Sequence, residues 1–228
     1  MKTNKLFSLL QFSFGALLMV APCSKGYAEN LVIEVTDKFE GLGYKELAAQ
    51  WWQWASSMSD DSGAVADTTG AKCGMEQSGS VWFLAGSYES SKVKRYCTVP
   101  AGKAIFFPVI NYVYWDENSA SVASCKKVQR DAQINDKEVS KLFVEIDGKK
   151  LENIQRFHVP SDCFDLYARL KTAQRPTEVA HAATDGYWIL LSPLSKGQHT
   201  ISFGGAYQEE PDGSATLKQD IEYVLTVE

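Results

Sequence analysis

Residues 93–115 read VKRYCTVPAGKAIFFPVINYVYW, and this stretch indicates a protein built mainly of β-strands. Residues 93–99 alternate along the chain, with Val93, Arg95, Cys97 and Val99 on one side, as in a strand with one buried face. A turn is expected at residues 100–103, and residues 104–115 are then almost continuously apolar and aromatic. Pro108 interrupts that run. Because proline has no amide proton to donate to a neighbouring strand, we expect an edge position or a β-bulge there.

The rest of the chain repeats this pattern of short strands separated by glycine and proline turns. The further strands are expected at residues 31–35, 80–85, 142–146, 151–159, 163–170, 186–191, 198–203 and 219–227. Asp147-Gly148 favours a hairpin turn, since these residue types adopt the positive φ angles that a tight turn needs. We therefore expect a mainly β (α+β) fold, an antiparallel β-sandwich.

One amphipathic helix rich in tryptophan is expected at residues 44–58. Its apolar positions follow a spacing of 3.6 residues and are Tyr44, Leu47, Ala48, Trp51, Trp54, Ala55 and Met58. Trp51 and Trp54 would hold the helix against the sheet. Trp52 points about 100° away from Trp51, so it either packs against a second layer or is partly exposed. A short second helix is expected within residues 119–134.

The N-terminus has the features of an export signal. Lys2 and Lys5 precede an apolar run, and Gly26-Tyr27-Ala28 has the small-x-small pattern that signal peptidases cleave after. We expect residues 1–28 to be removed, leaving one domain at residues 29–228 that is periplasmic or secreted. The alternative is a lipoprotein attached through Cys23, although a proline just before that cysteine disfavours it.

Charge and length limit the partners of the mature chain. Removal of residues 1–28 takes away three lysines and no acid, so the net charge falls from −5 to −8. An acidic surface repels phosphate backbones and anionic lipid headgroups, which argues against nucleic acid as a partner. The sequence contains no apolar segment of the roughly 20 residues that a membrane span requires.

Four cysteines remain after cleavage, and they allow three pairings. We favour Cys73 with Cys97 and Cys125 with Cys163, because each bridge closes a modest local loop and stabilises by about 3–4 kcal/mol in the chain-entropy model. The alternative is a four-cysteine zinc site. No two of these cysteines have the spacing of two to four residues usual in such sites, and an oxidising compartment favours disulfides.

Aromatic, acidic and amide side chains gather within residues 51–118, a mixture typical of carbohydrate sites. Rings stack on sugar C–H groups, and carboxylates accept bonds from hydroxyls. The candidate ligand contacts are Trp52, Asp67, Gln77, Trp82, Tyr112, Trp115 and Asp116. Each also has a structural interpretation, as a core tryptophan, a turn residue or the end of a strand. Asp67, or the acids at 116–117, would alternatively be calcium ligands; no other cofactor is expected.

Three functions fit this sequence. The first is a non-enzymatic binding or structural protein of the bacterial envelope, with a glycan or another small molecule as ligand. The second is a glycosidase-like hydrolase that pairs Asp67 with Asp116 or Glu117. The third is a secreted inhibitor or another module that binds a protein partner through an exposed apolar patch.

The histidines carry no catalytic or metal-binding motif. His199 shares strand parity with Ile201 and Phe203, so we expect a hydrogen-bonded histidine in the core. His158 and His181 match no metal-binding spacing. No catalytic residue is assigned from the sequence.

Several motifs together resemble a family of uncharacterised secreted bacterial proteins. They are WWQWA at 51–55, DTTG at 67–70 followed by Cys73, VWFLAG at 81–86 and VPAGKAIFFP at 99–108. The resemblance covers residues 44–206. It implies an exported bacterial protein, and it brings with it neither an activity nor a catalytic residue.

Overall fold

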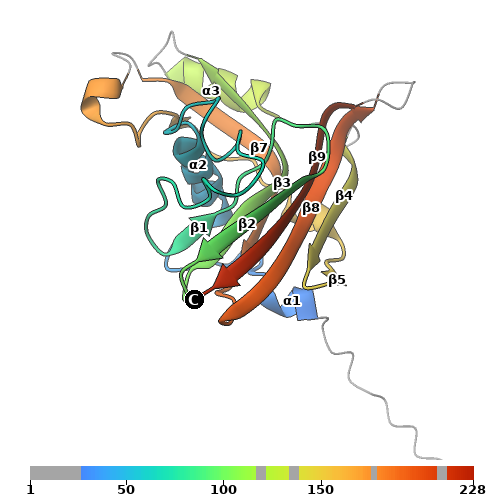
Figure 1. The fold of residues 1–228 in the computed structure, drawn as a ribbon. Coiled ribbons are helices and arrows are strands. Elements are labelled where there is room, and N and C mark those ends of the chain that lie inside the picture. Colours follow the sequence, from blue (N-terminus) through green and yellow to red (C-terminus); the bar gives the residue numbers. More distant parts are fainter. Residues whose placement is uncertain (1–26, 117–121, 134–138, 176–178, 210–214) are drawn as a thin grey trace, which may run out of the picture.

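The protein is a mainly β, sandwich-like α+β fold with two sheets (Figure 1). The computed structural model describes residues 27–116, 122–133, 139–175, 179–209 and 215–228. Residues 1–26 of the expected leader, which include Cys23, therefore lie outside the described residues. Glu117 also lies outside them. The expected fold class is confirmed.

The first sheet has the strand order β1-β3-β7-β6. Its centre is the antiparallel pair of β3 (Ala104–Asp116) and β7 (His181–Leu191). The short strand β1 (Val81–Phe83) runs parallel to β3, and β6 (Phe164–Asp165) runs antiparallel to β7. The register of β3 shifts between Pro108 and Ile110, which confirms the expected β-bulge. The bulge lets a proline sit in a central strand.

The second sheet has the order β2-β9-β8-β4-β5. Its strands are β2 (Val93–Val99), β4 (Val139–Ile146), β5 (Lys149–Lys150), β8 (Gly197–Glu209) and β9 (Ala215–Val227). The expectation of purely antiparallel sheets was wrong at two edges, since β2 is parallel to β9 and β1 is parallel to β3. The cause is the turn at 100–103, which carries the chain from one sheet to the other instead of closing a hairpin.

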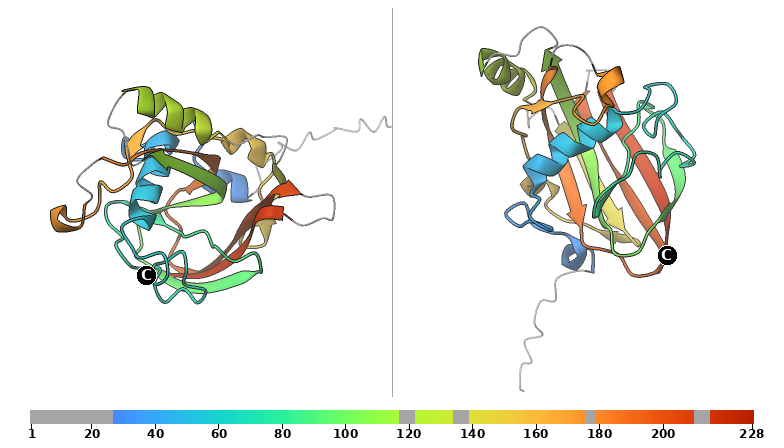
Figure 2. Two further views of the ribbon diagram at one scale, coloured as in Figure 1. Left: turned by 90° about the horizontal axis from the view of Figure 1, so that it is seen from above. Right: turned by 90° about the vertical axis from the view of Figure 1, so that its left-hand side faces the viewer.

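Helix α2 (Tyr44–Ala55) covers the outer face of the first sheet, and the second sheet covers the inner face (Figure 2). On the helix side, the ring centroid of Trp188 lies 5.7 Å from that of Trp51 and 5.3 Å from that of Phe106. Between the sheets, Phe107 packs on Phe203 with 4.5 Å between ring centroids. The β3–β7 pair is therefore buried on both faces, which explains its nearly continuous apolar sequence.

Helix α3 (Val122–Asp131) is the short second helix, and it confirms that expectation. It packs against the far ends of β3 and β7, where Val128 contacts Ala183 and Tyr114. Ala183 has the same strand parity as Ile189 and Asp185, so α3 lies on the face of the first sheet that also meets the second sheet.

Three expected strands differ from the structure. Residues 31–35 do not form a strand, because α1 (Tyr27–Leu31) ends there and only Val32 bridges to Leu191. The expected hairpin turn is present, with φ of 49° at Asp147 and 72° at Gly148, but its second strand is β5 alone. Residues 151–159 contain a 3₁₀ turn, η2 (Ile154–Phe157), and residues 163–170 are extended only in β6. Parts of these segments still bond to the edges of the first sheet, as the Ile33 amide does to the Leu190 carbonyl and the Val159 amide to the Gly186 carbonyl, but the bonds do not form a continuous ladder.

Both expected disulfides are confirmed. Cys73 pairs with Cys97 over a sequence separation of 24, and Cys125 pairs with Cys163 over a separation of 38. The first ties the long segment between α2 and β1 to β2, and the second ties α3 to the approach to β6.

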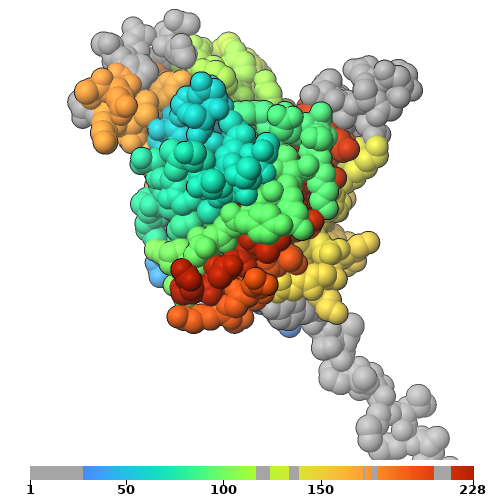
Figure 3. Space-filling view, viewed as in Figure 1, coloured from blue at the N-terminus to red at the C-terminus, as the bar shows by residue number. Residues whose placement is uncertain are grey.

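The segment between α2 and β1 is coloured cyan to teal in Figure 3 and covers much of the face shown there. This segment is anchored by Arg95. Its side chain is 1% exposed. The guanidinium donates to the carbonyl oxygens of Val65, Asp67, Ala85 and Gly86 and to the Tyr223 hydroxyl. A buried charge is tolerable when it is hydrogen-bonded, and each of the three guanidinium nitrogens donates here, so this one residue holds an irregular loop against a regular sheet.

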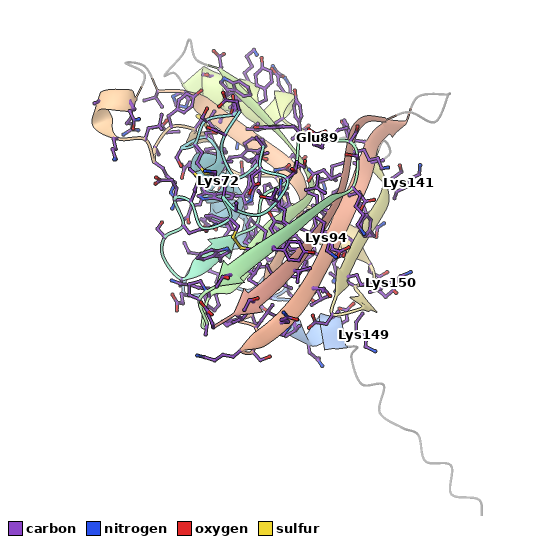
Figure 4. All side chains as sticks on the ribbon, in the orientation of Figure 1. Lys72, Glu89, Lys94, Lys141, Lys149 and Lys150 are labelled. Atoms are coloured by element: carbon purple, nitrogen blue, oxygen red, sulfur yellow. A yellow bond between two sulfur atoms is a disulfide. The ribbon has the colours of Figure 1, made fainter. Side chains whose placement is uncertain are left out.

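The outer surface of the second sheet is charged. Figure 4 shows Lys94 projecting from β2 and Lys149 and Lys150 projecting at the β5 edge. Lys92 and Lys94 both pair with Glu222 of β9, at 2.8 and 2.6 Å. Across the part of the chain that the structure describes, no helix combines the length and apolar composition needed to cross a membrane.

Replacing Arg95 with methionine should lower the free energy of unfolding by about 3 kcal/mol, because the substitution leaves buried carbonyl acceptors without donors. Urea denaturation at pH 7 measures the change. The matched control is Lys94→Met, one residue earlier on the exposed face of the same strand, which should move the urea midpoint much less because its ion pair with Glu222 is solvent-exposed. Equal midpoints for Arg95→Met and the wild type would contradict the anchoring role.

Candidate functional site

A pocket of about 570 Å³ opens where helix α2 ends. This volume is in the range of about 300–1,000 Å³ that is usual for small-ligand sites. The lining residues come from four separate segments and are Trp52, Ala55, Ser56, Met58, Ser59, Asp60, Tyr88, Val113, Trp115, Leu166 and Tyr167.

Aromatic rings dominate the walls of this pocket, which we call the aromatic pocket. Trp52 comes from α2, Trp115 from the end of β3, Tyr88 from the loop after β1, and Tyr167 from the segment after β6. Trp115 is 45% exposed and Tyr88 is 64% exposed, so both offer ring surface to solvent. Exposed large aromatics that meet at one hollow are the feature of this surface that indicates a ligand.

A small apolar cluster separate from the main core supports the pocket. Val113 and Leu166 are buried there, with Trp52 and Tyr167 packed against them. The indole Nε1 of Trp52 donates to the Thr184 hydroxyl at 2.9 Å. That hydroxyl donates in turn to the backbone carbonyl of Tyr112 at 2.6 Å. The ring of Trp52 is thereby held in one orientation by β3 and β7.

A second hydrogen bond attaches α2 to the opposite wall. The amide of Gln53 donates to the Asp165 carbonyl at 3.0 Å, and the Asp165 carboxylate accepts from the backbone of Tyr167 at 3.1 Å. The wall that carries Tyr167 is therefore fixed relative to the helix that carries Trp52. A ligand would find these two rings already placed, which lowers the entropy cost of binding.

Asp60 supplies negative charge at the rim. Partial burial, and then the nearby Asp60 carboxylate, raise the pKa of the Tyr88 phenol above its ordinary value. Tyr88 is therefore a neutral hydroxyl at physiological pH and can both donate and accept a hydrogen bond. Ser56 and Ser59 add two further hydroxyl groups to the lining.

The structure brings two of the seven sequence-predicted site residues into this pocket, Trp52 and Trp115. The other five lie elsewhere. Trp82 is 8% exposed and belongs to the core. The Gln77 amide donates to the carbonyls of Cys73 and Phe83 and accepts from the Phe83 amide, which makes it a clamp between a loop and β1.

Asp67 stabilises its own turn. One carboxylate oxygen accepts from the backbone and hydroxyl of Thr69, at 2.8 and 2.7 Å, and the other accepts from the Lys72 amide at 2.8 Å. Burial opposes ionisation, but these hydrogen bonds and the charge of Arg95 outweigh it, so the pKa of Asp67 lies below its usual 3.8. Both oxygens are used within the loop, so the geometry favours the turn interpretation over a calcium ligand.

Tyr112 and Asp116 also lie outside the aromatic pocket. Tyr112 is opposite Asp185 in the β3–β7 register, so its side chain points to the face away from α2. Asp116 is opposite His181 at the end of the same pair, on that same face. The side chain of Trp115 therefore points into the pocket while that of Asp116 points to the opposite face, because side chains alternate along a strand.

The sequence reasoning missed Asp60, Tyr88 and Tyr167. These residues lie in loops without periodicity, and no spacing relates them to Trp52. Only tertiary packing of three separate loops around the end of α2 brings them together. Solvent-exposed tyrosines in loops were the available signal, and this signal is weak by itself.

Each of the three histidines has a specific neighbour. His199 is 7% exposed, and its Nδ1 lies 2.8 Å from the Asp147 carboxylate, which confirms a hydrogen-bonded histidine in the core. Nε2 of His158 lies 2.7 Å from the carboxylate of buried Asp185. Nδ1 of His181 lies 3.1 Å from the Cys125 sulfur. Cys125, Cys163 and His181 form the one cluster of metal-type ligands among the described residues, and its two sulfurs are joined in a disulfide.

A second hollow of about 370 Å³ lies between residues 35–46 and 158–160. Its lining includes the charged side chains of Asp37, Lys38, Lys45 and Glu46. Tyr44 is its aromatic member and is almost fully buried, with the hydroxyl donating to the Ile33 carbonyl at 2.6 Å. This hollow lacks exposed ring surface, so the aromatic pocket is the stronger candidate site.

Comparison with known proteins adds little to this geometry. No protein-family model matches the chain, and no curated protein matches it. Among solved structures, the chain is similar to the solution structure of Amebosin at a TM-score of 0.20 and 8% identity, over 60% of this chain and 96% of that chain. A likeness of this size supports no inference about fold or function.

Replacing Asp67 with asparagine should destabilise the protein at pH 7 by about 0.5 kcal/mol, a small value because the carboxylate is partly solvated. A carboxyl with a lowered folded-state pKa contributes stability above the unfolded pKa. That contribution is lost as the pH falls through the folded-state value. The melting-temperature difference between wild type and Asp67→Asn should therefore shrink below pH 3.8. Asp37→Asn, at an exposed position, is the control substitution, and a pH-independent difference for Asp67→Asn would contradict this account.

Proposed function

We propose that this chain is an exported bacterial envelope protein that binds a carbohydrate, without catalysis, in the aromatic pocket. The observation that carries the proposal is the convergence of Trp52, Tyr88, Trp115 and Tyr167 around one hollow at the end of α2. The motif resemblance to uncharacterised secreted proteins and the two disulfides support the exported location.

The chemistry of the lining favours a sugar. A pyranose ring presents flat patches of C–H groups that stack on indole and phenol rings, and its edge presents hydroxyls. The Asp60 carboxylate and the hydroxyls of Ser56 and Tyr88 are groups that bind such an edge. The acidic rim and the net negative charge of the chain disfavour anionic ligands.

The alternative of a glycosidase-like hydrolase has weaker support. A retaining or inverting mechanism needs two carboxyl groups on either side of the scissile bond. Asp60 is the one acidic residue in the described lining of the pocket, and neither Asp67 nor Asp116 belongs to it. The geometry therefore favours binding over hydrolysis.

The alternative of an inhibitor or partner-binding module predicts a contiguous apolar patch. The large hydrophobic side chains exposed on the described surface are Met75, Tyr88, Tyr96, Tyr112, Trp115, Phe143 and Val179. They come from several strands and loops, and Tyr88 and Trp115 meet in the aromatic pocket. A concave site with rings on its walls fits a small ligand better than a flat protein surface.

Removal of either exposed ring should weaken sugar binding. Trp115→Ala and Tyr88→Ala should each raise the Kd for a neutral oligosaccharide about two- to tenfold, since one stacked ring contributes about 0.5–1.5 kcal/mol. A panel of soluble neutral oligosaccharides, titrated by calorimetry and tryptophan fluorescence, measures the effect. Tyr96→Ala is the matched control, because Tyr96 is equally exposed, at 63%, but lies on β2 outside the pocket.

Two outcomes would contradict this function. One is that no neutral oligosaccharide binds the wild-type chain at millimolar concentration. The other is that binding is unaffected by both ring deletions. Release of a reducing end from a bound oligosaccharide would instead favour the hydrolase.

Export predicts a processed and oxidised product. Expressed with its full sequence in a bacterial host, the chain should be recovered outside the cytoplasm beginning at Glu29, with no free thiol. Intact-mass measurement with and without a thiol-alkylating reagent tests both points. Retention of residues 1–28, or a lipid adduct on Cys23, would overturn the predicted cleavage.

A further inference from the structure

We propose that the Cys125–Cys163 disulfide is a thiol-exchange site, with His181 as the proton donor to the departing sulfur. Its substrate class is a dithiol reductant. The inference does not depend on sugar binding, since the disulfide lies on the face of the first sheet opposite the aromatic pocket.

The geometry places an imidazole against this disulfide. His181 is the first residue of β7, and its Nδ1 lies 3.1 Å from the sulfur of Cys125 and 3.4 Å from that of Cys163. All three side chains are half-buried rather than enclosed. A reagent can therefore reach the bond while the ring nitrogen stays within proton-transfer distance.

The other disulfide provides an internal comparison. Cys73 is half-buried, Cys97 is 5% exposed, and the Cys97 sulfur lies 3.8 Å from the Thr98 carbonyl oxygen. The chain has three histidines, and none contacts the Cys73–Cys97 pair, because His158 and His199 bind Asp185 and Asp147. One bridge has a neighbouring acid and the other does not.

The two sulfurs of the exchange site are not equivalent. Cys125 is the fourth residue of the ten-residue helix α3, so its sulfur lies in the first turn, where the positive end of the helix dipole favours a thiolate. It is also the sulfur closer to His181. Because the more acidic thiol is the better leaving group, an incoming thiolate should attack Cys163 and displace Cys125.

The step balances as a two-electron exchange. The incoming thiolate forms a bond to the Cys163 sulfur, and the Cys125–Cys163 bond breaks with its electron pair going to Cys125. His181 transfers a proton from Nδ1 to that sulfur and regains a proton from water. The second thiolate of the dithiol then displaces Cys163, which takes a proton from water. The reductant becomes a disulfide, and the protein holds two thiols.

Neighbouring charges select among reductants. In the β3–β7–β6 register, Asp116 and Asp165 are opposite His181 on its two sides, and Asp165 is paired with Arg175. On α3, Lys127 and Asp131 are paired with each other at 2.8 Å. The Asp116 carboxylate and the net negative charge of the chain repel an anionic thiol, so an uncharged dithiol should react faster than glutathione.

Timed reduction of the folded protein tests the site. The purified chain is treated with dithiothreitol at pH 7, quenched with acid and alkylated, and each cysteine is quantified by peptide mass spectrometry. Cys125–Cys163 should open at least about tenfold faster than Cys73–Cys97. Glutathione should give a mixed disulfide on Cys163 and a free thiol on Cys125.

The variant His181→Ala distinguishes proton donation by His181 from simple solvent exposure of the Cys125–Cys163 disulfide. It should slow the opening of Cys125–Cys163 about tenfold and leave Cys73–Cys97 unchanged, and added imidazole should restore the rate. His181→Gln, which keeps a polar group but donates no proton, should be equally slow. Near-ultraviolet circular dichroism checks that both variants are folded. Equal opening rates for the two bridges, or His181 variants as fast as the wild type, would overturn the proposal.

Discussion

The structure depends on the burial of the β3–β7 pair on both of its faces. A strand pair with apolar side chains above and below cannot face water on either side, so it requires two covers. Helix α2 supplies one through Trp51, and the second sheet supplies the other through Phe203. The tryptophan-rich helix and the second sheet therefore each bury one face of this strand pair.

The aromatic pocket follows from the end of one of these covers. Helix α2 ends at Ala55, while β3 continues as far as Asp116. On the α2 side, Val113 and Trp115 therefore lie at the end of the helix, where Trp52 and the rings of two loops surround them. On the other side α3 takes over from the second sheet and brings Cys125 against His181. Both candidate sites lie where the central strands extend beyond their main covers.

Buried polar groups fix the conformation of the segment between α2 and β1, which apolar packing alone does not determine. Arg95 joins an irregular segment to β2 through backbone carbonyls, and Asp67 and Gln77 organise the same segment from within. Hydrogen bonds need defined directions, whereas apolar contacts tolerate sliding. Residues that a sequence pattern suggests as ligand contacts serve here to give a long loop one conformation.

Elements with a local signal were predictable from the order of residues alone. The alternation in Val93–Val99, the helical spacing around Trp51 and the Asp147-Gly148 turn each predicted the structure that forms, and short loop closure predicted both disulfides. The parallel edges, the loss of a strand at residues 31–35 and the meeting of Trp52 with Tyr88 and Tyr167 were decided by tertiary structure. These features arise from contacts between residues far apart in the chain, and periodicity, which describes only neighbouring residues, carries no information about which distant surfaces will pack together.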